Sequence, residues 1–211
     1  MKQAVDSVKT LVRRAMKVVA RSLNVLSGGR LTPNMVTWFG FLMHIPIALL
    51  IARGELVWGG ILLVIFGLFD TLDGELARLQ KRVTNNGGFL DASTDRFKEV
   101  LLYSAAAYLF VSSEPARPAY AALAVAACGA SICVSFVKAK GETIVAASRQ
   151  QIPYPELNKM FSGGLFPFEI RMFMLVVGLL ADKLIWAVGA IALFSAITAF
   201  QRLFIISRRI A

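Results

Sequence analysis

Two pairs of aspartates between residues 70 and 95 constrain this chain more than any other feature. Asp70 and Asp73 are three residues apart, so a helix places them on one face. Asp91 and Asp95, four residues apart, share a face of the next helix in the same way. Burying a carboxylate in an apolar protein is costly unless cations compensate its charge. Two such faces turned toward each other would form an all-oxygen site suited to Mg²⁺ or Mn²⁺, with room for a phosphate.

The composition of the chain indicates a polytopic membrane protein. Of its 211 residues, 57% are hydrophobic, and apolar runs long enough to cross a bilayer recur along the sequence. The first of these runs begins only after Pro33, so we expect no secretory signal peptide. The pattern predicts an all-α integral membrane fold with six transmembrane helices, at 34–52, 57–79, 91–113, 117–145, 166–182 and 184–206.

The N-terminal segment is amphipathic. Apolar side chains recur in it at helical spacing, while lysines and arginines fall elsewhere on the helical wheel. This pattern is typical of a helix that lies along the membrane interface rather than across it. A Gly-Gly pair at 28–29 interrupts the pattern, and Pro33 suits the entrance of the next helix. We therefore expect an N-terminal interfacial helix over 1–30 and a transmembrane domain over 31–211.

Positive charge is concentrated at alternate ends of the predicted spans. The formal net charge is +10, and seven of the 23 basic residues lie within the first 30 positions. The other basic clusters, at 78–82, 138–140 and 202–209, share one side of the membrane in the six-span arrangement. The positive-inside rule then places both termini and the aspartates on the cytoplasmic side of the cell membrane. This charge pattern favours anionic membrane lipids over nucleic acid as partners.

The residues around the aspartates favour a nucleoside-diphosphate ligand. Gly74 leaves room for a ligand beside Asp73, and Arg78, one turn later, can bind a phosphate through two N–H groups. A polar connection over 80–88 suits an antiparallel hairpin, and its Thr84 offers a hydroxyl to a ribose or nucleobase. Acids buried in membrane spans also occur in ion transporters, which are the alternative of a different class. Clustering at the ends of two helices, beside an arginine, favours phosphate binding.

The spacing Asp-x2-Asp-Gly-x2-Ala-Arg-x8-Gly-x3-Asp-x3-Asp over 70–95 resembles the signature of the CDP-alcohol phosphotransferase family. In that family a divalent cation holds the pyrophosphate of a CDP-linked lipid, the hydroxyl of a second alcohol attacks the lipid-side phosphorus, and CMP leaves. The resemblance implies a homodimer and two Mg²⁺ or Mn²⁺ ions, with Asp95 as a general base. It implies that the metal ligands are Asp70, Asp73, Asp91 and Asp95, and that the CDP-lipid site is lined by Pro33, Asn34, Met35, Val36, Gly74, Ala77, Arg78 and Thr84.

A second set of basic residues indicates the acceptor alcohol. The segment 135–142 is similar to the Ser-Tyr-x-Lys-Ala-Arg-Ala-Glu stretch of the phosphatidylinositol-phosphate synthase branch of the family. That branch transfers the lipid phosphate to inositol 1-phosphate, and the likeness implies acceptor contacts from Lys138, Lys140, Arg171 and Arg202. Departures at Lys140, Gly141 and Phe168, where relatives have arginine, alanine and arginine, leave glycerol 3-phosphate or another small alcohol as alternative acceptors.

Overall fold

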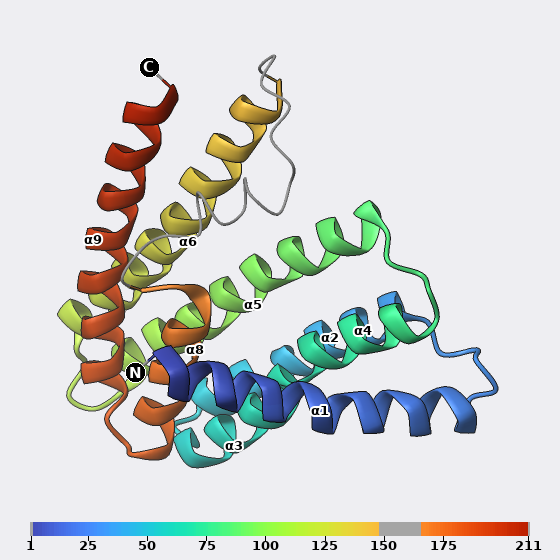
Figure 1. Ribbon diagram of the computed structural model, residues 1–211. Helices are drawn as coiled ribbons and strands as arrows, with labels where there is room; N and C mark the ends of the chain where they lie inside the picture. The colour runs from blue at the N-terminus through green and yellow to red at the C-terminus, as the bar shows by residue number, and fades with distance from the viewer. Residues whose placement is uncertain (1, 148–165, 211) are drawn as a thin grey trace.

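The computed structural model describes residues 2–147 and 166–210, and these residues form eight helices and no strand (Figure 1). The all-α prediction is therefore confirmed for the described part of the chain. In chain order the helices are α1 (Lys2–Leu26), α2 (Pro33–Ala52), α3 (Leu56–Gly67), α4 (Phe69–Leu79), α5 (Asn85–Ser112), α6 (Pro118–Ala147), α8 (Phe168–Leu180) and α9 (Leu184–Ile210).

Four helical segments of the described chain are long and apolar enough to cross a membrane. The two other predicted spans, 91–113 and 166–182, fall on α5 and α8. The first half of α5 carries several charged side chains, and α8 has 13 residues, fewer than the roughly 20 that a bilayer requires. The count of six spans therefore stays a prediction. The four segments are Pro33–Ala52, Leu56–Leu79, Pro118–Val145 and Leu184–Arg208.

The helix boundaries near the aspartates differ from the predicted ones. Helix α5 begins at Asn85 because Thr84 caps it: the Thr84 Oγ1 accepts a hydrogen bond of 3.0 Å from the Gly87 amide. The connection between the two aspartate-bearing helices is thus shorter than the predicted 80–88. The predicted span 57–79 is divided at Leu68, whose amide bonds to the Ile65 carbonyl three residues back. This tighter turn lies directly before the α4 aspartates.

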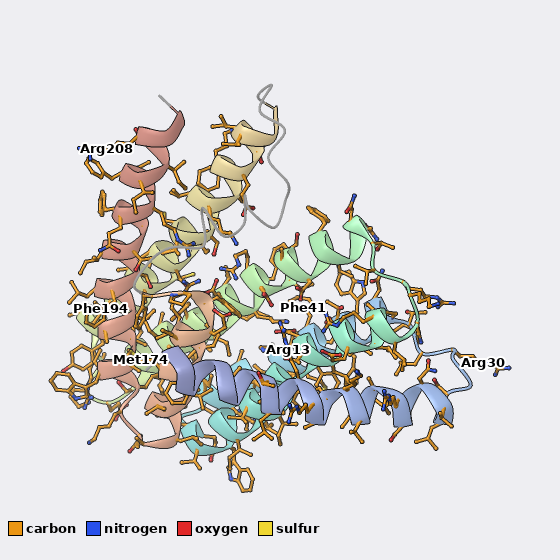
Figure 2. The ribbon with its side chains drawn as sticks, viewed as in Figure 1. Arg13, Arg30, Phe41, Met174, Phe194 and Arg208 are labelled. Atoms are coloured by element: carbon orange, nitrogen blue, oxygen red, sulfur yellow. The ribbon has the colours of Figure 1, made fainter. Side chains whose placement is uncertain are left out.

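The helices form two groups that α5 joins (Figure 1). On one side α2 packs against α3, α4 and α5, and α1 runs beside α4. On the other side α6 packs along α9, and α8 contacts both α9 and α3. Figure 2 places Phe194 and Met174 in the α8–α9 part, with Arg208 near the end of α9 and Arg30 in the connection after α1.

Helix α1 is attached to α4 by an apolar seam and a polar contact. Buried Ala20 packs in one cluster with Leu72 and Leu76 of α4. At the end of this seam the Gln80 side-chain amide donates to the Asn24 Oδ1 and to the Leu31 carbonyl, each at 2.8 Å. The N-terminal helix therefore supports the helix that carries the first aspartate pair.

Helices α2 and α4 approach closely at Gly40. A Cβ atom at this position would lie 3.0 Å from the Cβ of Phe69, closer than ordinary packing allows. Small residues at such contacts let membrane helices approach each other's backbones. The close approach brings the Thr37 side chain of α2 against Asp73 of α4.

The α8–α9 hairpin offers a stability test. A Cβ atom at Gly178 would collide with the Cβ of Ala187, so Gly178→Ala should lower the melting temperature, with an overpacking cost of about 1–3 kcal/mol. Gly129→Ala is the matched control, because nothing lies within 4 Å of a Cβ there. Thermal unfolding of the detergent-purified variants measures both. Equal melting temperatures for Gly178→Ala and the wild type would contradict the close packing of this hairpin.

Candidate active site

Three of the four predicted aspartates converge between α4 and α5. Carboxylate oxygens of Asp70, Asp91 and Asp95 all lie within 4.8 Å of one another. The Lys98 ammonium reaches into the same group, at 2.5 Å from the Asp70 Oδ1 and 3.1 Å from the Asp95 Oδ1. Lys98 is only 3% exposed. The cluster therefore combines three acids with one buried cation.

The fourth aspartate, Asp73, lies beside this cluster rather than inside it. Its Oδ2 accepts a hydrogen bond of 2.5 Å from the Thr37 hydroxyl, and Thr37 in turn contacts the Pro33 carbonyl at 3.2 Å. Asp73 is buried and is repelled by the charges of Asp70 and Asp91. The structure thus brings all four aspartates to one place, with Asp73 turned toward α2.

The cluster fits a hard divalent cation. Asp91 Oδ1 is a buried oxygen with no hydrogen-bond partner within the described part of the chain. The nearby donors are carboxylate oxygens, the ligands that Mg²⁺ and Mn²⁺ prefer. An unpartnered buried carboxylate oxygen is costly, and a metal ion would compensate it. Asp70, Asp91 and Asp95, with Asp73 adjacent, are therefore a coherent metal-binding set.

A pocket of about 180 Å³ opens next to the aspartates. Of the eight predicted CDP-lipid residues, six line it. Met35 and Val36 are not in its lining: Met35 is 54% exposed, and Val36 packs in the apolar cluster with Leu72. The lining residues are Pro33, Asn34, Thr37, Asp73, Gly74, Ala77, Arg78, Arg82, Val83, Thr84, Gly87, Gly88 and Asp91.

The pocket offers a mixture of charged and hydrogen-bonding groups. The Arg78 guanidinium is exposed and pairs with Glu75 at 2.6 Å, so it remains close to the surface of the pocket. A Cβ at Gly74 would stand 3.5 Å from that guanidinium and would narrow the space. Because Asp73 and Asp91 also line the pocket, a phosphate bound here would lie beside the carboxylate cluster.

Among the predicted acceptor residues, Arg171 is fully enclosed. It is 0% exposed, and its guanidinium contacts the Glu99 Oε1 at 3.4 Å and donates to the Phe166 carbonyl at 3.0 Å. Glu99, also 0% exposed, accepts a hydrogen bond from Ser131 and pairs with Arg96 at 2.5 Å. Glu99 thus compensates two arginines in the interior.

The other predicted acceptor residues lie on α6 and α9. Lys138 pairs with Glu142 at 3.6 Å, and Lys140 is exposed. Arg202 is 7% exposed and donates to the Val134 carbonyl at 2.9 Å, across the α6–α9 contact. The structure therefore distributes the four cations over three helices, two of the side chains being buried and two nearer the surface.

Sequence reasoning missed Lys98, Arg96 and Thr37. Lys98 lies three residues after Asp95, so both reach the same face of α5. Arg96 pairs with Glu99 and donates to the Ser135 hydroxyl at 2.5 Å. Charged residues inside a predicted apolar span were the available signal for the first two. Thr37 carried no such signal, because its partner is 36 residues away.

Comparison with known proteins gives a consistent result. The family model for CDP-alcohol phosphatidyltransferase matches residues 30–201. Phosphatidylinositol phosphate synthase of Corynebacterium glutamicum is 31% identical over 184 residues, which cover 82% of this chain and 77% of that protein. The synthase of Mycobacteroides abscessus is 30% identical over 157 residues, covering 69% of this chain and 71% of the relative.

A solved structure has the same fold. It is the crystal structure of Mycobacterium tuberculosis phosphatidylinositol phosphate synthase with CDP-DAG bound, with a TM-score of 0.77 and 26% identity over 92% of this chain and 94% of that one. The family match spans most of the chain and includes every aspartate of the cluster. The chain therefore belongs to the CDP-alcohol phosphatidyltransferase family, and it is a multi-pass membrane enzyme of the phosphotransferase type.

Proposed function

We propose that the protein transfers a phosphatidyl-type group from a CDP-linked lipid to the hydroxyl of inositol 1-phosphate, with release of CMP. The observation that carries the proposal is the convergence of Asp70, Asp91 and Asp95 beside a pocket lined by Asp73 and Arg78. The similar proteins named phosphatidylinositol phosphate synthase, and the related structure with CDP-DAG bound, support the choice of donor and acceptor. Family membership favours this reaction over ion transport.

The donor nucleotide would occupy the pocket between the beginnings of α2 and α5 and the end of α4. Arg78 is placed to bind a phosphate, and Asn34 and Thr84 offer polar atoms for the ribose or base. All of these residues are at helix ends, so a lipid tail could stay among membrane lipids while the headgroup enters the pocket. Met35 and Val36, which were also predicted for the CDP-lipid site, would then lie outside the lining of this pocket.

The chemistry requires charge compensation and a proton acceptor. A divalent cation, when bound by the aspartates, would offset the pyrophosphate charge and stabilise the attacking and leaving oxygens. Asp95 would accept the proton of the acceptor hydroxyl while that oxygen bonds to the lipid-side phosphorus and the bond to CMP breaks. Thr37 would hold Asp73 in a fixed orientation toward the pocket.

The acceptor phosphate would be bound by cations on the α6, α8 and α9 side of the aspartates. Lys138 and Lys140 lie near the end of α6, while Arg171 and Arg202 supply positive charge from buried positions. A phosphate dianion suits several convergent cations. Glycerol 3-phosphate shares this chemistry and is the alternative acceptor within the same reaction.

The membrane arrangement completes the proposal. We place the aspartate cluster and both termini on the cytoplasmic side of the cell membrane, because basic residues gather at that end of the helices. Residues 1–30 would lie along the interface and residues 31–211 would form a six-span catalytic domain, with α5 and α8 among the spans. We expect a homodimer from the resemblance to the family.

Replacing the proposed base tests the reaction. Asp95→Asn should lower metal-dependent CMP release from a CDP-lipid by roughly 10²–10⁴-fold, since the amide cannot accept the proton. Asp182→Asn is the matched control, because Asp182 is an exposed residue with positive φ, a conformation that asparagine also adopts. Full activity in folded Asp95→Asn, or unchanged CMP release in EDTA, would refute the proposal.

The hydrogen bond that orients Asp73 can be tested separately. Thr37→Val removes the hydroxyl donor to a carboxylate, a contact that contributes about 1.5–3 kcal/mol, so transfer efficiency should fall about tenfold or more. Thr198→Val is the control, since the buried Thr198 hydroxyl donates to the Phe194 carbonyl of its own helix. Initial rates at varied CDP-lipid measure the effect. Equal loss in both variants would mean that Thr37 acts through general stability.

The acceptor assignment has its own test. Initial rates with inositol 1-phosphate, glycerol 3-phosphate and serine should be highest with inositol 1-phosphate. Lys138→Gln should raise the KM for that acceptor about tenfold and leave the KM for the CDP-lipid unchanged. Lys183→Gln, at an exposed turn between α8 and α9, is the charge-matched control. An unchanged acceptor KM in Lys138→Gln would contradict the proposed pocket. Arg171 is less suitable, because removing it takes away one of the two arginines that pair with buried Glu99.

A further inference from the structure

Lys98 is a buried cation inside the carboxylate cluster. It follows Asp95 by three residues on α5, and its ammonium lies between Asp70 of α4 and Asp95 of α5. No part of the 70–95 motif includes it. A lysine that is 3% exposed is almost always paired, and here both partners are proposed metal ligands.

The four aspartates differ in whether Lys98 compensates their negative charge. Lys98 bonds to Asp70 and Asp95, which are absent from the pocket lining. Asp73 and Asp91 line the pocket, and Asp91 Oδ1 has no hydrogen-bond partner within the described residues. The cluster therefore has an inner half, Asp70 and Asp95, that already holds a positive charge. Its pocket-facing half, Asp73 and Asp91, makes no ion pair among the residues that the structure describes, although Arg78 and Arg82 line the same pocket.

We propose that Lys98 takes the place of a second metal ion, so that this site binds one divalent cation per chain. The inference rests on the proposed function and concerns only how many ions the same carboxylates hold. A cation bridging Asp70 and Asp95 would stand about 2.1 Å from the oxygens that the Lys98 ammonium now contacts at 2.5 and 3.1 Å. Steric overlap and charge repulsion exclude both cations from one position.

Burial keeps the lysine in place. The ammonium contacts one carboxylate of α4 and one of α5, and withdrawing it would leave a buried positive charge without these two partners. Lys98 also holds the two helices together before any metal binds. Within the metal-binding set, Asp70 and Asp95 would then keep Lys98, and Asp91, with Asp73 adjacent, would hold the single ion on the side of the pocket.

Metal stoichiometry tests the inference. The purified protein in detergent is titrated with Mn²⁺ in the presence of CDP, and free Mn²⁺ is measured by electron paramagnetic resonance. The wild type should bind one ion per chain. Lys98→Met, similar in length but uncharged, should bind two, and Lys98→Arg should remain at one. Two ions in the wild type, or one in a folded Lys98→Met variant, would overturn the inference.

A second measurement covers the case in which Lys98→Met unfolds without metal. Its melting temperature in EDTA should fall below that of the wild type and recover with Mn²⁺, because the ion restores the missing charge. A loss that Mn²⁺ does not restore would contradict the role of Lys98 as a cation substitute. Binding of two ions by the wild type would contradict the inference about Lys98 but not the proposed transferase function. Binding of one ion without CMP release would contradict the transferase function but not the inference about Lys98.

Discussion

The carboxylates between α4 and α5 repel one another, and the surrounding side chains compensate this repulsion. Asp70, Asp91 and Asp95 have carboxylate oxygens within 4.8 Å of one another, in a chain of which 57% of the residues are hydrophobic. The acids are compensated unequally: Lys98 bonds to Asp70 and Asp95, Thr37 donates to Asp73, and Asp91 keeps an oxygen without a hydrogen-bond partner among the described residues. Such an arrangement favours a bound cation, because charge of one sign cannot be buried alone.

The helices that carry these acids are not held together by the hydrophobic effect alone. Lipid tails are as apolar as leucine, so helix contacts in a membrane depend on close packing and on hydrogen bonds. Gly40 supplies the close packing at α2 and α4, and Gln80 ties α4 to the end of α1 through Asn24 and Leu31. The pocket therefore has walls fixed by helix ends rather than by long loops.

The buried charges around Glu99, on the proposed acceptor side, are compensated in a different way. Glu99 pairs with Arg96 and Arg171 in the interior, and both guanidinium groups lie over the ring of Phe168, at 4.9 and 5.7 Å from its centre. An arginine in place of Phe168 would add a third positive charge beside these two. The aromatic face instead attracts cations while adding no charge. The departure seen in the sequence at Phe168 is thus part of this buried network.

The sequence alone determined the helical class and which aspartates share a helix face, because spacings of three and four residues fix that pairing. The family resemblance supplied six of the residues that line the pocket beside the aspartates. Helix starts depend on capping contacts, and the Thr84 cap places the beginning of α5 at Asn85, earlier than the predicted 91. Only the tertiary structure decided that Lys98 lies between Asp70 and Asp95, that Thr37 holds Asp73, and that Arg171 is enclosed with Glu99. These contacts join residues on different helices, and their geometry follows from packing rather than from local periodicity.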